Sequence, residues 1–298
     1  MKKRTFKAKR LLIAIAYLLV LALICALIAY FTGYEIYRDI SYGDTEANVM
    51  DIYLPKDAYE RESNGCVLFI HGGSWSGGDK SEEEARCRLL AAHGYVAVTM
   101  NYTLCGESED YDVFTVLDEI DAALSRIQSF AIEQGISIDK VATSGYSAGA
   151  HLSMLYSYSR ANESVMDLRF TANMAGPADI SPEIWDTYRT ARIASILSGS
   201  EITEEMVLSG EVDELLAKIS PVTYVNEETI PSIIIHGGRD TTVPPGNAES
   251  LLNKFNEFSV THKYLYLEDS DHMLIHNPIG HLGYYGDLIE YCHIYFGD

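Results

Sequence analysis

Basic residues are scarce in this sequence once its first ten positions are set aside. The 298 residues contain 22 lysines and arginines against 43 aspartates and glutamates. Six of the basic residues stand at positions 2–10, which leaves 16 against 43 acids, a net charge near −27, for the rest of the chain. A surface this acidic repels phosphate backbones and anionic lipid headgroups. The balance therefore argues against nucleic acid as a partner and against a domain that lies flat on an anionic membrane.

Cysteine is also rare, and its spacing matches no zinc pattern and no C-x-x-C redox pair. The five cysteines are Cys25, Cys66, Cys87, Cys105 and Cys292. An exterior location would permit a disulfide between Cys87 and Cys105, whereas buried free thiols are the favoured alternative. Neither state bears on the chemistry, and the sequence predicts no metal site.

One long stretch lacks charge altogether. Residues 11–31, LLIAIAYLLVLALICALIAYF, follow the basic flank and contain no aspartate, glutamate, lysine or arginine. A helix of this length measures about 31 Å, close to the hydrocarbon thickness of a bilayer. The run exceeds the 7–15 residues of a signal-peptide core and offers no clean cleavage site, so we favour an uncleaved anchor. A cleaved signal peptide and a buried helix remain the alternatives.

The basic flank predicts the orientation of this anchor. Under the positive-inside rule the N-terminus stays in the cytoplasm, and the chain after the anchor lies on the outer side of the cell membrane. The sequence thus divides into residues 1–34, a basic flank with a transmembrane segment, and residues 35–298, a tethered domain. The lipid bilayer is the expected partner of the first part.

Strands and helices alternate along residues 35–298. Such alternation is typical of an α/β fold with a mostly parallel central sheet and helices on both faces, and two leading strands joined by a short turn indicate an antiparallel edge. Residues 179–221 interrupt the alternation with helical patterns and are predicted to form a small cap over the carboxyl edge of the sheet. The expected strands cover residues 34–43, 47–55, 66–73, 95–102, 139–147, 170–176, 231–238 and 263–270; the expected helices cover 81–94, 113–134, 148–159 and about 284–296.

A serine stands between two glycines where one of these strands must become a helix. Gly145, Tyr146, Ser147, Ala148 and Gly149 form the pattern G-x-S-x-G. In this strand–turn–helix setting the pattern predicts a nucleophile elbow, a tight turn that needs small neighbours and lifts the serine hydroxyl above the sheet. The start of the following helix adds free N–H groups and a positive dipole end.

A serine nucleophile needs a base, and the base needs an acid that orients it. On such a fold the order along the chain is serine, acid, histidine. Asp240 follows the strand in IIIHGGRD, 93 residues after Ser147, and His272 follows the strand in YLYLEDSDH, 32 residues later. Asp240 and His272 are therefore the predicted acid and base. The alternatives are Asp179, Asp269 and Asp271 for the acid and His276 for the base.

A third motif, HGGSW, follows the strand that ends near residue 70. Glycines let the backbone approach a substrate closely and aim N–H groups at a developing oxyanion. The loop from His71 through Gly72, Gly73 and Ser74 is thus the predicted oxyanion hole, with Gly73 and Ser74 as donors and the N–H of Ala148 as a further one. His71 is expected to brace this loop. Trp75 and Tyr146 are candidate substrate contacts, with packing as the alternative for Trp75.

Together the motifs HGGSW, GYSAG, HGGRDTTVP and SDH, with DIYLP and ISPVTYV nearby, resemble the α/β-hydrolase superfamily. More narrowly the chain is similar to its carboxylesterase/lipase branch, near hormone-sensitive-lipase-like and bacterial feruloyl-esterase-like enzymes. The resemblance covers residues 35–298 and implies Ser147, Asp240 and His272 as the triad. Ser74 departs from the family pattern, which has a third glycine there, and a membrane anchor is unusual for this branch.

The favoured function is an esterase that cleaves a small-molecule carboxylic ester, of short acyl or acetyl/feruloyl type, through an acyl-serine. Such chemistry needs no cofactor. A serine peptidase or amidase of the same superfamily is the alternative enzyme, and it is disfavoured because no propeller domain is present. A binding protein on a catalytically dead hydrolase fold is the non-enzymatic alternative, disfavoured because all three triad positions are intact. The sequence indicates no oligomeric state.

Overall fold

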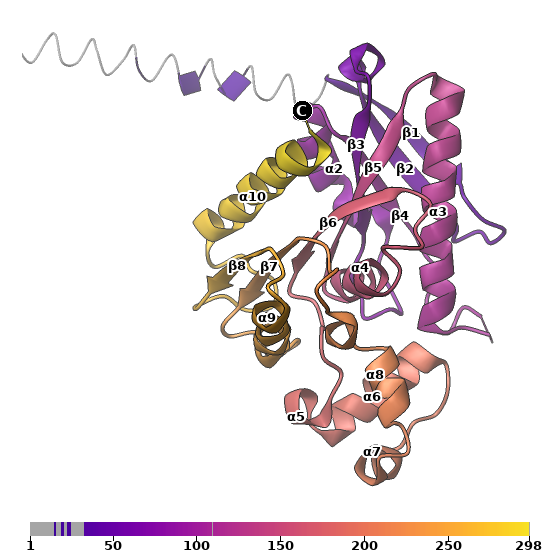
Figure 1. Cartoon of the computed structure of the whole chain (residues 1–298), viewed down its shortest axis with the longest axis vertical. Helices are drawn as coiled ribbons and strands as arrows, with labels where there is room; N and C mark the ends of the chain where they lie inside the picture. The colour runs from indigo at the N-terminus through magenta and orange to yellow at the C-terminus, as the bar shows by residue number, and fades with distance from the viewer. Residues whose placement is uncertain (1–14, 16–18, 21–22, 25–32, 109, 298) are drawn as a thin grey trace, which may run out of the picture.

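The computed structural model describes residues 15, 19–20, 23–24, 33–108 and 110–297. Within them eight strands form one sheet in the order β1-β2-β4-β3-β5-β6-β7-β8 (Figure 1). The strands are β1 (Tyr34–Ser41), β2 (Val49–Pro55), β3 (Asn64–Ile70), β4 (Val96–Met100), β5 (Ile138–Tyr146), β6 (Asp167–Met174), β7 (Ser232–Gly237) and β8 (His262–Leu267).

The sheet has an antiparallel edge and a parallel body. β1 pairs with β2, and β2 with β4, in antiparallel fashion, whereas β4, β3, β5, β6, β7 and β8 are all parallel neighbours. The predicted mostly parallel sheet with antiparallel leading strands is therefore confirmed. Because the parallel strands end at one edge, the turns that follow β3, β5, β7 and β8 gather there.

Helices cover both faces of this sheet, as the sequence predicts. They are α2 (Glu84–Ala92), α3 (Val113–Gln134), α4 (Ala148–Ser159), α9 (Gly246–Phe258) and α10 (Pro278–Phe296). Leu68 and Ile70 of β3 pack in one core with residues of α3 and α4, while Val67 and Phe69 pack in another with residues of α2 and α10. The alternation of side chains along a strand divides the apolar residues between two cores. The sheet is thus buried on both sides.

Two helix boundaries differ from the sequence prediction. The last helix begins at Pro278, six residues before the predicted start, because Pro is tolerated in a first turn and the Asn277 side chain accepts a hydrogen bond from the Gly280 N–H. Residues 80–83 form a 3-10 turn, η2, rather than the start of α2. There the Asp79 carboxylate caps the turn by accepting a hydrogen bond from the Ser81 N–H.

The segment between β6 and β7 is helical throughout much of its length and lies beyond the end of the sheet (Figure 1). It contains α5 (Pro182–Trp185), α6 (Thr187–Ser198), α7 (Glu204–Ser209), α8 (Asp213–Lys218) and the 3-10 turn η3 (Pro221–Tyr224). These elements coincide with the segment predicted to be a cap. Whether the segment acts as a cap stays a prediction.

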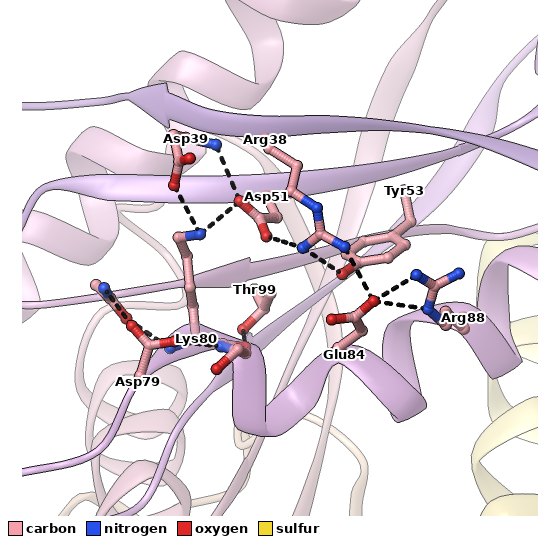
Figure 2. Close-up of polar contacts among 11 residues, drawn as sticks. Arg38, Asp39, Asp51, Tyr53, Asp79, Lys80, Glu84, Arg88 and Thr99 are labelled. Atoms are coloured by element: carbon pink, nitrogen blue, oxygen red, sulfur yellow. Dashed lines mark hydrogen bonds and ion pairs between the residues drawn. The ribbon is translucent and has the colours of Figure 1, made fainter.

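An ion cluster around the buried Asp51 carboxylate joins the antiparallel edge to the segment that follows the HGGSW loop. Figure 2 shows the Lys80 ammonium between Asp39 and Asp51, at 2.9 and 2.7 Å, while Asp51 also binds Arg38 at 2.7 Å. The Asp51 side chain is fully buried and Asp39 is 70% exposed. Two cations offset the cost of burying one carboxylate. The cluster therefore fixes Lys80, and with it the far end of the loop that begins at Gly72.

Cys66, Cys87, Cys105 and Cys292 are free thiols in the structure, so the conceivable disulfide between Cys87 and Cys105 is absent. Burial raises the pKa of the Cys87 thiol well above its usual value, as for an inert buried thiol. Most of the predicted transmembrane segment, residues 11–31, lies outside the described residues. In the described part no helix has the length and apolarity needed to cross a bilayer.

Candidate active site

Ser147 occupies a sharp turn between β5 and α4. Its backbone has φ 55° and ψ −119°, a region that non-glycine residues rarely adopt. A β-carbon on Gly145 would stand 2.3 Å from the Gly149 carbonyl, and one on Gly149 would stand 2.0 Å from the Ile70 carbonyl oxygen. Both glycines are therefore required, because the incoming strand, the outgoing helix and β3 approach too closely for any side chain.

The three residues predicted as a triad meet at the carboxyl edge of the sheet. His272 Nε2 lies 3.0 Å from Ser147 Oγ, and His272 Nδ1 lies 2.7 Å from Asp240 Oδ2. A carboxylate only accepts, so Nδ1 carries the imidazole proton and Nε2 is free to accept from the serine hydroxyl. Asp240 is buried, and the His272 side chain is 15% exposed. The arrangement is a continuous hydrogen-bonded chain from acid to serine.

The loop after β7 holds Asp240 in position. Its Oδ1 accepts hydrogen bonds from the N–H groups of Thr242 and Val243, at 2.9 and 2.8 Å, which leaves Oδ2 for His272. His236, which no sequence motif singles out, also contacts this loop. Its Nε2 is 3.0 Å from the Val243 carbonyl oxygen and 3.6 Å from Asp240 Oδ2. A carbonyl only accepts, so this nitrogen is protonated. Burial lowers the pKa of His236 and keeps the ring neutral.

The alternative acids and the alternative base have other partners. Asp179 accepts from the Ser250 hydroxyl, and Asp269 pairs with Arg239 at the surface. Asp271 lies 3.2 Å from His276, and both side chains are about half exposed. Neither residue of this pair belongs to the chain of hydrogen bonds that contains Ser147.

Tyr146 contacts His272, the predicted base, through both its hydroxyl and its ring. Its hydroxyl donates to the His272 carbonyl at 3.0 Å, and its ring lies 5.1 Å from the imidazole, centre to centre. Burial raises the pKa of Tyr146 to about 12, so the phenol stays a donor. The predicted substrate contact of Tyr146 stays a prediction, and the structure adds a positioning contact that no sequence motif announces.

The HGGSW loop lies directly beside Ser147. A β-carbon on Gly72 would meet the Ser147 β-carbon at 3.4 Å, and Gly73, Ser74 and Trp75 all have positive φ, at 114°, 52° and 60°. Within the described residues the N–H groups of Gly73 and Ser74 have no hydrogen-bond partner. The N–H of Ala148, the first residue of α4, is likewise left over by the helix. These three groups are the donors that the sequence predicts for an oxyanion hole.

Two buried histidines brace this loop. His71 donates from Nδ1 to the Gly72 carbonyl, 2.7 Å away, and stacks on Tyr102 at 4.4 Å. His151 of α4 accepts from the Trp75 indole at 3.2 Å and donates from Nε2 to the Ile219 carbonyl at 2.8 Å. Burial lowers the pKa of His151 to about 4, which matches this neutral tautomer. No sequence pattern singles out His151, because a buried histidine in a helix carries no local signature.

A cavity of about 190 Å³ opens onto Ser147. Ser74, Trp75 and Ala148 line it together with Trp185, Ile193 and Ile196 of the helical segment. Ser147, Ser74 and Ala148 all line the cavity, so an ester carbonyl placed here would lie beside the serine hydroxyl and two of the free N–H groups. In chemical terms the site can attack an acyl carbonyl and stabilise the resulting oxyanion.

Comparison with known proteins places this site in a family context. The model of the BD-FAE family matches residues 50–255 of this chain. Among curated relatives, Esterase LipC of Mycobacterium tuberculosis is 25% identical over 74% of this chain and 55% of its own length. A probable isoprenylcysteine alpha-carbonyl methylesterase, ICME, of Oryza sativa is 23% identical over 82% of this chain and 59% of its own. The chain thus spans little more than half of the length of these relatives.

Solved structures share the fold at low sequence identity. A truncated carbohydrate esterase from gut microbiota superposes with a TM-score of 0.73 at 18% identity, covering 88% of this chain and 96% of that one. The esterase Est2 of Thermogutta terrifontis gives a TM-score of 0.67 at 19% identity, over 88% and 92%. At these identities the likeness concerns the fold alone.

Proposed function

Because this chain belongs to the BD-FAE family, we propose that it is a carboxylesterase that works through an acyl-serine intermediate. The observation that carries the proposal is the hydrogen-bonded chain from Asp240 through His272 to Ser147, which ends at an open cavity. Relatives whose names describe esterases give it further support.

The geometry supports a two-step reaction. His272 Nε2 takes the Ser147 proton as the serine oxygen forms a bond to the ester carbonyl, and the N–H groups of Gly73, Ser74 and Ala148 stabilise the oxyanion. The oxyanion then collapses, the C–O bond to the alcohol breaks, and His272 gives its proton to the departing oxygen. A water molecule next attacks the acyl-serine with His272 as base, which releases the acid and restores the Ser147 hydroxyl. Asp240 keeps the imidazole oriented and stabilises its cationic form throughout.

A short acyl group suits this cavity better than a long chain. Its volume of about 190 Å³ lies below the range of about 300–1,000 Å³ typical of sites for drug-sized ligands. Its lining includes aromatic and aliphatic side chains, among them Trp75, Trp185 and Ile193. Acetyl and other small acyl esters, with an aromatic or sugar alcohol reaching outward, are therefore the proposed substrates.

The helical segment 179–221 is proposed to act as a cap, and residues 1–34 as a cytoplasmic flank and membrane anchor. The cap is supported by Trp185, Ile193 and Ile196, which line the cavity from α5 and α6. The anchor is supported by the charge-free run 11–31 and its basic flank in the sequence. Protease added to intact cells should release the domain if it lies outside, and full protection would remove the proposed orientation.

The esterase proposal is tested with the full-length chain in detergent on p-nitrophenyl acetate, butyrate and decanoate, and on alanine p-nitroanilide. We expect turnover of acetate and butyrate, weaker turnover of decanoate and none of the anilide. Ser147→Ala and His272→Ala should each lower kcat/KM by about 10⁴-fold or more, since triad members act as a unit. Cleavage of the anilide without ester turnover would instead indicate a peptidase.

A further inference from the structure

The cavity beside Ser147 contains the only two arginines in residues 33–108 and 110–297 that lack a carboxylate partner. Ten arginines lie in these ranges, and eight of them form an ion pair with an aspartate or glutamate, namely Arg38, Arg61, Arg86, Arg88, Arg126, Arg160, Arg169 and Arg239. Arg189 and Arg192 form none, and both line the cavity. Two lysines of these ranges, Lys56 and Lys140, also lack a carboxylate partner, but neither lines the cavity.

Both arginines stand on the face of α6 that lines the cavity. Arg189, Arg192, Ile193 and Ile196 follow the spacing i, i+3, i+4 and i+7, which places them on one side of a helix, and all four line the cavity. The apolar pair contributes the wall, and the two guanidinium groups contribute positive charge within the same space as Ser147 and the HGGSW loop.

Arg189 is held in place by neutral groups. Its Nη2 donates to the carbonyls of Thr241 and Thr242, at 3.2 and 2.6 Å, and its guanidinium lies over the Trp185 ring at 4.9 Å. None of these contacts neutralises the charge. Arg192, one turn further along α6, is exposed and has no hydrogen bond or ion pair to any described residue. One cation is thus fixed and the other is free to bind.

We propose that Arg189 and Arg192 select an ester that carries a carboxylate, so that the substrate of this enzyme is a monoanionic ester. A guanidinium binds a carboxylate through two parallel hydrogen bonds, and such bonds are among the strongest available to a protein. The strongly acidic chain repels an anionic ester in general, whereas these arginines give the cavity positive charge that attracts the anion. This inference names the substrate class of the proposed esterase and rests on that function.

The experiment compares esters that differ only in charge. 4-Acetoxybenzoate is paired with 4-acetoxybenzamide, which places the anion on the alcohol side, and monoethyl succinate with ethyl succinamate, which places it on the acyl side. We expect kcat/KM to favour the acid over the amide by about tenfold or more in at least one pair, since a hydrogen-bonded charge contributes about 1.5–3 kcal/mol. The ratio within a pair does not depend on how much protein is folded.

Variants test whether the arginines cause the preference. Arg192→Gln should bring the ratio close to one, and Arg192→Lys should keep part of it. Arg169→Gln is the matched control, because this substitution removes the same charge from the chain. Arg169 pairs with Asp167 at the start of β6, away from the carboxyl edge of the sheet. The control should leave the ratio unchanged. A wild-type ratio of one or below in both pairs, or a preference that survives Arg192→Gln, would overturn the inference and leave the esterase function standing.

A binding measurement separates the two proposals. Calorimetric titration of Ser147→Ala with uncleaved 4-acetoxybenzoate and 4-acetoxybenzamide should show tighter binding of the acid, lost in Ser147→Ala/Arg192→Gln. Tighter binding of the acid together with a wild type that cleaves no ester would sustain the anion site and remove the esterase. Equal binding of acid and amide, with turnover of both by the wild type, would remove the anion site only.

Discussion

The α-carbon of Gly149 lies so close to the Ile70 carbonyl that an added β-carbon would stand 2.0 Å from its oxygen. This contact joins the first turn of α4 to the end of β3, and therefore joins Ser147 to the loop that begins at Gly72. The distance between the proposed nucleophile and the proposed oxyanion donors depends on it.

Gly149→Ala should accordingly destabilise the fold and abolish activity in the fraction that folds. Relief of the clash requires α4 or β3 to move, which costs about 2 kcal/mol or more and lowers Tm by about 4 °C or more. Gly286→Ala is the matched control, because it lies in helix α10 with open space around it and should stabilise by about 0.5–1 kcal/mol. Thermal unfolding followed by circular dichroism compares the two, and an unchanged Tm for Gly149→Ala would contradict the account.

Lys80→Met should weaken both the fold and catalysis. The change leaves the buried Asp51 carboxylate with Arg38 as its remaining cation, and breaking a buried pair costs about 3 kcal/mol or more. Because Lys80 ends the segment that begins at the oxyanion loop, we also expect a lower kcat on p-nitrophenyl acetate. Asp39→Asn removes the exposed partner of the same ammonium and should cost less than about 1 kcal/mol. Equal effects of the two substitutions would show that burial of Asp51 is not decisive.

Tyr146→Phe should lower kcat about fivefold and leave KM nearly unchanged. The phenol donates to the His272 carbonyl, and loss of one neutral hydrogen bond is worth about 1 kcal/mol. Tyr59→Phe, a change at an exposed tyrosine, serves as the control. A rise in KM with unchanged kcat would instead indicate that Tyr146 contacts the substrate, as the sequence first suggested.

Stability should fall between about pH 6.5 and pH 4. His151 is buried and neutral, and burial lowers its pKa from 6.5 to about 4. Above pH 6.5 the His151 ring is neutral in both the folded and the unfolded state. Between pH 6.5 and pH 4 the unfolded state takes up a proton that the folded state does not. The free energy of unfolding therefore falls as the pH drops towards 4. His151→Gln should flatten this slope in urea titrations, while His93→Gln, at an exposed histidine, should not. An identical slope in both variants would contradict the assignment.

The sequence predicts the sheet, its antiparallel edge and most helices because alternating apolar runs and glycine stops are local signals. It also places Ser147, Asp240 and His272 at strand ends, and the topology then brings those ends together. The supports of the site were missed for a physical reason. These supports act through contacts between segments far apart in the chain, and such contacts leave no local pattern in the sequence. They are His236 against the loop that contains Asp240, His151 against Trp75, and the hydroxyl of Tyr146 against His272.

The unpaired arginines were missed for a related reason. Whether Arg189 or Arg192 has an acidic partner depends on the packing of the helical segment against the loop after β7. In the sequence they are two ordinary basic residues of an amphipathic helix, indistinguishable from Arg86 and Arg88, which do form ion pairs.

Covalent trapping tests the central claim most directly. The full-length chain is mixed with a fluorophosphonate or with p-nitrophenyl acetate, quenched in acid and measured by intact-protein and peptide mass spectrometry. The account predicts one adduct per chain, located on the peptide that contains Ser147, with no adduct in Ser147→Ala and much slower labelling in His272→Ala. An adduct on any other residue, or ester hydrolysis that persists undiminished in Ser147→Ala, would contradict it.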